Sequence, residues 1–154
     1  MTVVAQAEVV VDATPEEAFA IFTDEIGLWW RRDTPYWNDR ERGLTLRVEP
    51  YVGGRFVEVY DLETQEGFEV GRVTAWEPGR RFALTWTQVG WPEGAFTDVE
   101  VTFAQETEGT RVRLEQSGFE RVPGAEQFVG GYDTGWKTVL GFFAEHTSET
   151  RSSR

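Results

Sequence analysis

The stretch GRVTAWEPGRRFALTW, residues 71–86, determines the fold class that this sequence predicts. In its second half Phe82, Leu84 and Trp86 alternate with smaller or more polar residues. A period of two is typical of a strand with one face toward the core. Between the halves, EPGRR (77–81) contains the proline and glycine of a tight turn. The stretch therefore predicts a β-hairpin.

Similar alternation continues on both sides of this hairpin. Leu46 and Val48, for example, share a face opposite Arg47. Short strands with hairpin-length links and one polar face indicate a sheet of consecutive antiparallel strands. Counting the N-terminal strand, we expect about seven strands in all. The segments outside the hairpin are VVAQAEVVVD (3–12), LTLRV (44–48), GGRFVEVYD (53–61), VEVTF (99–103) and RVRLEQ (111–116).

Two short helices are predicted after the first strand. Thr14 is a natural N-cap, Pro15 occupies the first helical position, and Glu17 completes a capping box. Asp24 is expected to cap the second helix, EIGLWW (25–30), whose Trp29 and Trp30 fall on one side with Ile26. At least one of these two tryptophans is expected to pack against the core.

A long closing helix is predicted after Gly124. Its glycines at 130, 131 and 135 weaken the first half, so the firm part is expected from about Asp133 to His146. The sequence thus predicts one domain over residues 1–146 and a flexible tail over 147–154. The apolar stripe at exact i, i+4 spacing consists of Phe128, Tyr132, Trp136 and Leu140.

These segments, in this order, resemble the START-like (SRPBCC) helix-grip superfamily. Within it they are most similar to the proteins named for activators of the heat-shock-protein-90 ATPase. The resemblance spans Val9 to Glu145. It implies an α+β fold in which a curved antiparallel sheet of about seven strands wraps around a long C-terminal helix. The segments that carry it are VDATPEEAFAIFTD with LWW, YVGGRF, GRVTAWEPGRRFALTW, VEVTFAQETEGTRVRLEQSGF and GWKTVLGFF.

The resemblance also implies a pocket for a hydrophobic ligand between the sheet and the closing helix. The resemblance does not imply that this chain activates a chaperone. Eukaryotic activators hold the chaperone through an additional N-terminal domain, for which we expect no room in 154 residues. Fold alone does not specify function.

Composition excludes several classes of partner. The 15 basic and 27 acidic residues give a net charge of −12, which repels nucleic acids and anionic membrane surfaces. No apolar run is long enough to insert into a membrane. The chain has no cysteine, and its N-terminus lacks a signal-peptide pattern, so we expect a cytoplasmic protein.

The sequence contains no recognisable catalytic constellation. Its only histidine, His146, falls at the end of the closing helix. The glycine pairs match neither a phosphate loop nor a dinucleotide fingerprint, and no metal-ligand cluster is present, so no cofactor and no metal are expected. Glu58 is the one candidate acid, since it alternates with Phe56 and Tyr60; it would be either a half-buried pocket carboxylate or an outward, ion-paired residue. Gln116 and Asp133 are weaker polar candidates.

A ring-rich inner face is the main functional signal. Aromatic residues with polar tips suit a pocket wall, because each offers a hydrogen bond beside a large apolar surface. Tyr36 and Trp37 lie in the loop before the second strand and are expected to act as a lid. The predicted ligand-binding residues are Trp30, Tyr36, Trp37, Phe56, Glu58, Tyr60, Trp86, Phe103, Phe128, Tyr132, Trp136 and Leu140.

Three functions fit these observations. The first is binding of a small hydrophobic or amphipathic molecule, such as a lipid, without catalysis. The second is a cyclase- or aromatase-like enzyme that uses Glu58 or a tyrosine. The third is a protein-interaction module, with a chaperone or a second copy of the chain as partner. The third predicts an exposed patch of Trp29, Trp30, Tyr36 and Trp37.

Overall fold

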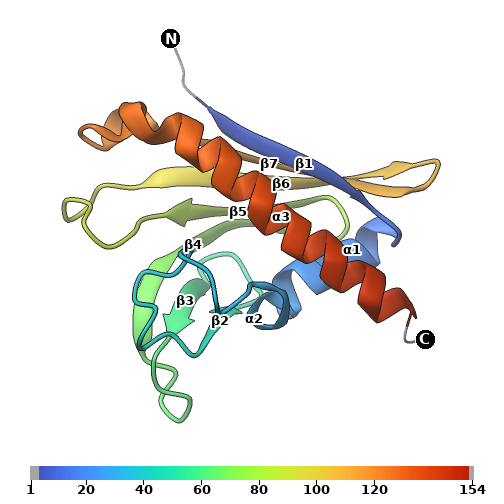
Figure 1. Cartoon of the computed structure of the whole chain (residues 1–154), viewed down its shortest axis with the longest axis horizontal. Coiled ribbons are helices and arrows are strands. Elements are labelled where there is room, and N and C mark those ends of the chain that lie inside the picture. The colour runs from blue at the N-terminus through green and yellow to red at the C-terminus, as the bar shows by residue number, and fades with distance from the viewer. Residues whose placement is uncertain (1–3, 153–154) are drawn as a thin grey trace.

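Seven strands form one antiparallel sheet in the spatial order β1-β7-β6-β5-β4-β3-β2 (Figure 1). The computed structural model describes residues 4–152, except for the side chains of residues 126, 128, 151 and 152. From β2 to β7 each strand pairs with its neighbour in sequence, and β1 joins the edge beside β7, so the predicted meander is confirmed. The strands are β1 (Ala5–Val11), β2 (Thr45–Val48), β3 (Arg55–Val59), β4 (Gly67–Glu77), β5 (Arg81–Trp86), β6 (Thr97–Glu106) and β7 (Gly109–Ser117).

The β4–β5 hairpin forms as its sequence predicts. Trp76 pairs with Phe82, and Glu77 pairs with Arg81 across the turn. The chain reverses at Gly79, whose φ of 79° lies in the left-handed region that glycine adopts without steric cost. The proline–glycine signal therefore located this turn correctly.

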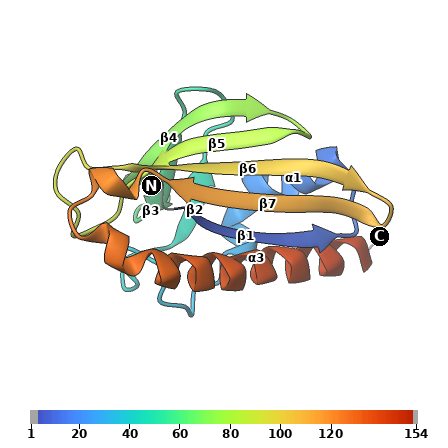
Figure 2. The same ribbon diagram turned by 90° about the horizontal axis from the view of Figure 1, so that it is seen from above.

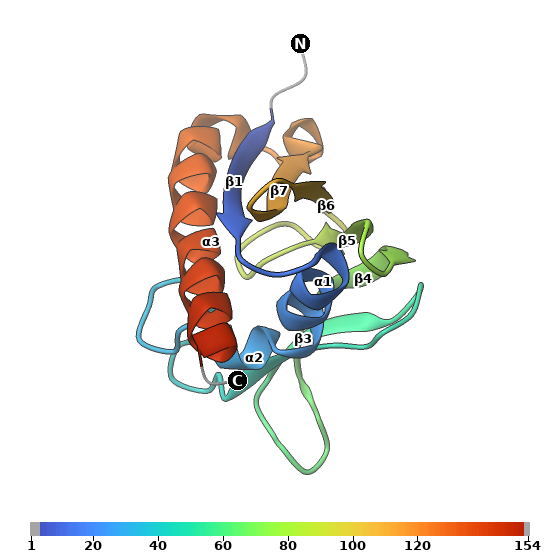
Figure 3. The ribbon, with the colours of Figure 1, turned by 90° about the vertical axis from the view of Figure 1, so that its right-hand side faces the viewer.

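Two irregularities bend the sheet. The register shifts between Val73 and Ala75 in the β4–β5 pair, and between Phe56 and Val57 in the β3–β4 pair. Such bulges add an unpaired residue and increase the local bend and twist. In Figure 3 the strands follow a curve from β1, beside α3, round to β3 near α2. The curve creates the concave face that holds the helices.

α1 (Pro15–Asp24) begins at the predicted capping box. Thr14 Oγ1 accepts a hydrogen bond from the Glu17 N–H, and the Glu17 carboxylate accepts one from the Thr14 N–H, both at 3.1 Å. The prediction that Asp24 caps the next helix is wrong. α1 continues through Asp24, and a capping residue must itself be non-helical.

α2 (Ile26–Trp29) is a single turn that follows α1 after Glu25. Its Ile26 and Trp29 are buried, as is the next residue, Trp30. The Trp29 indole donates to the Phe22 carbonyl at 3.1 Å, which ties α2 to α1. Both tryptophans thus belong to the core, as the sequence predicted for at least one of them.

The closing helix is longer than predicted at both ends. After two 3-10 turns, η1 (Phe119–Arg121) and η2 (Ala125–Phe128), α3 runs from Val129 to Ser152. Residues 147–152 are therefore helical, and their prediction as a flexible tail is wrong; residues 153–154 lie outside the described part. Thr147 is 0% exposed and donates from Oγ1 to the Phe143 carbonyl at 2.9 Å. Burial of this turn keeps the helix intact.

α3 lies along the concave side of the sheet, nearest to β1 (Figure 2). Its C-terminal half packs on α1, where the Phe143 ring lies 5.2 Å from that of Phe22 between centroids. Phe22 in turn lies 6.0 Å from Phe103 of β6, so α1 connects α3 to the sheet here. Each buried phenylalanine contributes roughly 2–3 kcal/mol. Within residues 4–152, none of the helices combines the length and apolar character needed to span a bilayer.

Candidate ligand-binding site

A cavity of about 550 Å³ lies beneath the N-terminal half of α3. Its volume is within the range typical of sites for drug-sized molecules. Three segments form its walls: the loop after α2, the end of β5 with the loop after it, and α3. The lining residues are Trp30, Pro35, Tyr36, Trp37 and Asn38; Trp86, Gln88, Val89, Gly90 and Trp91; and Gly131, Tyr132, Gly135, Trp136 and Val139.

Two glycines of α3 leave space for the cavity. Gly131 and Gly135 are one helical turn apart and therefore share a face. A Cβ atom at Gly131 would meet no atom within 4 Å, and one at Gly135 would lie 3.5 Å from Tyr36 Cε1. A larger side chain at either position would project into the open volume. The glycines that weaken this half of the helix thus also widen the cavity.

Three indoles form the inner end of the cavity. The Trp86 and Trp136 rings meet edge to face at 5.1 Å, and Trp30 lies 6.1 Å from Trp136 and 6.4 Å from Trp86 between centroids. Edge-to-face geometry is favourable for aromatic rings because of their quadrupoles. Such walls suit a flat apolar molecule.

A buried hydrogen-bonded chain fixes Trp136. Its Nε1 donates to Gln116 Oε1 at 2.7 Å, and Gln116 Nε2 donates to Thr97 Oγ1 at 2.9 Å. Thr97 Oγ1 in turn donates to the Trp86 carbonyl at 3.2 Å. Gln116 is fully buried, and its amide serves Trp136 and Thr97 rather than the cavity.

The indole N–H of Trp86, unlike that of Trp136, is not hydrogen-bonded to any described residue. Its Nε1 is buried and has no hydrogen-bond partner among the described residues. Buried polar atoms in proteins are almost always paired, so each exception requires an explanation.

Glu58 supports one wall of the cavity from behind. Its side chain is 1% exposed and is not among the lining residues. The carboxylate accepts hydrogen bonds from the Asn38 N–H at 2.7 Å, the Asp39 N–H at 2.8 Å and the Tyr60 hydroxyl at 2.6 Å. Neither expected environment, the pocket or an outward ion pair, describes it. It holds the loop between α2 and β2.

Asn38 connects two walls of the cavity. While its backbone is held by Glu58, its Oδ1 accepts a hydrogen bond from the Val89 N–H at 2.8 Å. The loop after α2 is therefore tied directly to the loop after β5. Val89 is 58% exposed, so this junction lies at the rim of the cavity.

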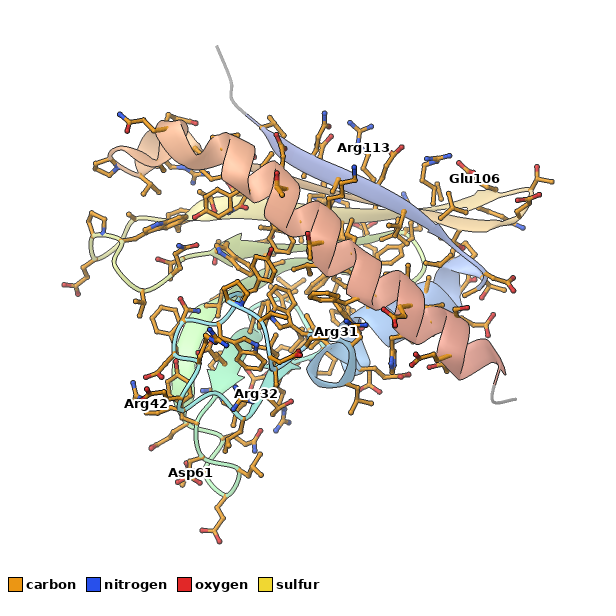
Figure 4. All side chains as sticks on the ribbon, in the orientation of Figure 1. Arg31, Arg32, Arg42, Asp61, Glu106 and Arg113 are labelled. Carbon is orange, nitrogen blue, oxygen red and sulfur yellow. The ribbon has the colours of Figure 1, made fainter. Side chains whose placement is uncertain are left out.

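The first residues of the loop after α2 are bound to α3. Arg31, which lies beside α3 in Figure 4, forms an ion pair with Glu145 and stacks 4.8 Å above the Phe142 ring centroid. Trp37 Nε1 donates to the Arg31 carbonyl at 2.9 Å. The loop is thus held at both ends, and Trp37 is folded inward.

The polar groups of the cavity are neutral. The Tyr132 hydroxyl donates to Gln88 Oε1 at 2.8 Å, and burial raises the pKa of Tyr132 to about 12. Outside the cavity, burial and the hydrogen bond to Glu58 raise the pKa of the Tyr60 phenol. Both phenols are therefore protonated at neutral pH. Of the described residues that line the cavity, none has a charged side chain.

The structure brings half of the predicted site residues together. Trp30, Tyr36, Trp37, Trp86, Tyr132 and Trp136 all line the cavity. Phe56, Glu58, Tyr60, Phe103 and Leu140 do not, although Phe56 contacts the Trp86 ring at 5.7 Å. The Phe128 side chain lies outside the described part of the structure. Asp133 accepts a hydrogen bond from the Gln6 N–H of β1 at 2.7 Å and so links α3 to the sheet.

Sequence reasoning missed the small and loop residues of the wall. One signal could have found part of it: Gly131, Gly135 and Val139 form a stripe of small side chains beside the predicted aromatic stripe of the same helix. A row of small residues next to large ones leaves a hollow on a helix face. Asn38, Gln88 and Trp91 lie in loops without periodicity and gave no comparable signal.

The exposed aromatic patch expected of an interaction module does not form. Trp29, Trp30 and Trp37 are 2%, 6% and 8% exposed, and Tyr36 is half-buried. The indole N–H groups of Trp30 and Trp37 are used within the loop, by the Tyr36 and Arg31 carbonyls. These rings fill the interior instead of a surface.

Residues suited to acid–base or metal chemistry lie elsewhere. His146 pairs with Glu25 at 2.8 Å and is not among the lining residues. Within the described part of the chain, no three His, Asp or Glu side chains gather in a way that could hold a metal ion.

A curved antiparallel sheet that grips a long C-terminal helix, with an aromatic cavity between them, defines the helix-grip class of α+β proteins. Comparison of the sequence with models of protein families identifies the family within this class. The chain belongs to the family described as Activator of Hsp90 ATPase homolog 1-like protein, whose model matches residues 12–147. No curated protein matches the chain.

Solved structures with this fold confirm the predicted architecture. Protein MLL2253 from Mesorhizobium loti is 23% identical, with a TM-score of 0.69, and the match covers 96% of this chain and 98% of that one. The AHSA1-like protein RHE_CH02687 from Rhizobium etli is 27% identical, with a TM-score of 0.62 and coverages of 96% and 82%. Txn09, described as an anthrahydroquino-gamma-pyrone synthase, is 26% identical, with a TM-score of 0.60 and coverages of 92% and 95%.

Proposed function

We propose that the protein binds a small hydrophobic or amphipathic molecule in the cavity beneath α3, without converting it. The observation that carries the proposal is the cavity of about 550 Å³ with uncharged, ring-rich walls. A packed interior would have been more stable, because apolar volume left unfilled costs dispersion contacts. Two glycines where the helix faces the cavity support a role for the open space.

The absence of charge favours binding over catalysis. General acid–base catalysis needs a group whose pKa lies near the working pH. Among the described lining residues, the groups that can exchange a proton are Tyr36 and Tyr132, and the pKa of Tyr132 is about 12. Glu58, the acid candidate of the sequence, is occupied by backbone donors of the loop.

A cyclase-like enzyme is the second candidate. It is supported by the 26% identity to Txn09, a protein described as a synthase, over 92% of this chain. Cyclisation of a flexible precursor can depend on pocket shape and on a phenol in the wall, and Tyr36 and Tyr132 provide phenols there. The two candidates are distinguished by the fate of the bound molecule. Ligand recovered with unchanged mass and retention time supports binding, and a new product supports the enzyme.

Equilibrium dialysis with fluorene, a flat hydrocarbon, tests the binding proposal. The wild-type protein should bind it at micromolar concentration. Gly135→Leu should weaken binding by at least about tenfold, because the new side chain enters the cavity. Gly141→Leu is the matched control on the same helix, since a Cβ there meets nothing within 4 Å and Gly141 does not line the cavity. Equal binding by Gly135→Leu and wild type, or no binding by the wild type, would contradict the proposal.

A further inference from the structure

The half-buried Trp86 side chain differs from four buried tryptophans in how its indole N–H is used. Four other tryptophans donate their Nε1 hydrogen to a named oxygen: Trp29, Trp30, Trp37 and Trp136. The Nε1 of Trp86 is inaccessible to solvent but has no acceptor among the described residues. The indole donor of Trp86 therefore lies where none of the described residues accepts its hydrogen bond.

The surroundings of Trp86 explain why the donor stays unpaired. The neighbouring rings are Phe56 at 5.7 Å, Trp136 at 5.1 Å and Trp30 at 6.4 Å, and none has an acceptor oxygen. The amide oxygens of Gln116 and Gln88 accept hydrogen bonds from Trp136 and Tyr132 and none from Trp86. A buried donor without a partner destabilises the fold, whereas phenylalanine would fill much of the same space without that cost.

We infer that Trp86 determines ligand specificity by donating its indole hydrogen bond to a carbonyl oxygen of a planar aromatic molecule. The inference rests on the proposed function, because it needs an occupant in the cavity. Trp86 itself lines that cavity, so an occupant meets its ring directly. On binding, the ring must turn to present its N–H to the occupant, because Nε1 has no exposed surface in the structure without a ligand. The ligand then provides the acceptor that the described part of the chain does not offer to this N–H.

The walls restrict the chemistry of this acceptor. A carboxylate would be buried without a cation, since no described lining residue is charged, and burial of an unpaired charge is strongly unfavourable. A neutral carbonyl avoids this cost and still accepts a hydrogen bond. The flat indole and phenol faces favour a fused-ring body. Together these features specify an aromatic ketone or lactone.

The test compares 9-fluorenone with fluorene, which share a flat three-ring shape but differ in the carbonyl. Equilibrium dialysis gives both affinities for the wild type, Trp86→Phe and Trp76→Phe. Trp76→Phe is the matched control, because Trp76 is half-buried like Trp86 but packs against Phe19 and Phe82 and does not line the cavity. We expect the wild type and Trp76→Phe to prefer fluorenone by about tenfold, and Trp86→Phe to lose that preference while still binding fluorene.

Each outcome has a distinct meaning. Equal affinities of the wild type for the two compounds, or an undiminished preference in Trp86→Phe, would overturn the role of Trp86 while fluorene binding still supports the proposed function. Failure of the wild type to bind either compound would overturn both. Thermal unfolding provides a second readout that needs no ligand. Trp86→Phe should melt above Trp136→Phe, because the latter loses the same ring size and also leaves Gln116 without its donor.

Discussion

The carboxylate of Glu58 positions a loop that it does not belong to. Two backbone N–H groups of that loop, from Asn38 and Asp39, donate to it, and the Tyr60 hydroxyl provides a third donor. Hydrogen bonds to a carboxylate are stronger than bonds between neutral groups. The Asn38 side chain also accepts a hydrogen bond from the Val89 N–H, which joins the loop after α2 to the loop after β5. The Glu58 side chain, by holding Asn38, therefore fixes two walls of the cavity.

Glu58→Gln should therefore lower stability. The amide nitrogen would face backbone or phenol donors, so at least one of these buried groups would lose its acceptor. We expect a loss of about 2 kcal/mol in the free energy of unfolding, measured by urea denaturation. Glu63→Gln, at an exposed position, should stay within about 0.5 kcal/mol of wild type. A Glu58→Gln protein as stable as wild type would contradict the supporting role.

Tyr132 makes stability depend on pH at the alkaline end. Its pKa is about 12 in the folded protein and 10.0 in the unfolded chain. Between these values the unfolded chain releases the proton and the folded protein keeps it, so stability is complete below pH 10 and falls as pH rises toward 12. Tyr132→Phe should reduce this fall by about 1 kcal/mol at about pH 11, since one pH unit above the unfolded pKa corresponds to at most about 1.4 kcal/mol and the group is partly exposed. Chemical denaturation at about pH 9, 10 and 11 measures this difference. Tyr51→Phe, at an exposed tyrosine, is the control; an identical slope in Tyr132→Phe and wild type would exclude the effect.

At the scale of elements, α3 combines two different surfaces. Its first half presents Gly131 and Gly135 to the cavity, and its second half packs Phe143 against α1 and α2. Burial of the second half anchors a helix whose first half is weakened by glycine. The open site and the stable core are therefore parts of one continuous element.

The extent of α3 can be tested with adjacent substitutions. Thr147→Asp would place a charge at a fully buried position and should cost about 3 kcal/mol in the free energy of unfolding. Ser148→Asp, one residue further and exposed, should change it by less than about 0.5 kcal/mol apart from a small helix-dipole effect that both variants share. If thermal and urea unfolding give the same stability for both variants, the last helical turns do not pack as described.

Local sequence signals predicted those features that depend on interactions between residues close together in the chain. The capping box at Thr14 and the turn at Gly79 depend on side-chain chemistry within four residues, and both form as predicted. The ends of α3 depend on tertiary burial, which the sequence pattern does not reveal. The pattern therefore predicted that the firm part of the helix ends at about His146, whereas the helix ends at Ser152. Asp24 was misassigned for a related reason, since α1 extends one residue too far for it to act as a cap.

At the scale of the whole molecule, the concave face of the sheet is filled unequally. Phenylalanines of α1, with Trp29, fill the end near the C-terminus of α3. At the other end, Trp30, Trp86 and Trp136 surround open volume instead of closing it. A hydrophobic molecule bound there would complete the interior.

The site was only partly predictable because a cavity is defined by what its surroundings leave empty. Alternation and helical spacing placed Trp86, Tyr132 and Trp136 on inward faces, and all three line the cavity. The same rules placed Phe103 and Leu140 inward, but both are buried in the core and neither lines the cavity. Which inward residue meets open space depends on how far each loop and helix lies from the sheet, and periodicity does not encode that distance.

The most direct test of the central claim is a crystal structure of the protein with 9-fluorenone. The account predicts the ring system in the cavity, against Gly135 and between Trp136 and Tyr36, with its oxygen within hydrogen-bonding distance of Trp86 Nε1. Fluorenone bound outside this cavity, or an interior closed by its own side chains with no ligand inside, would contradict the account.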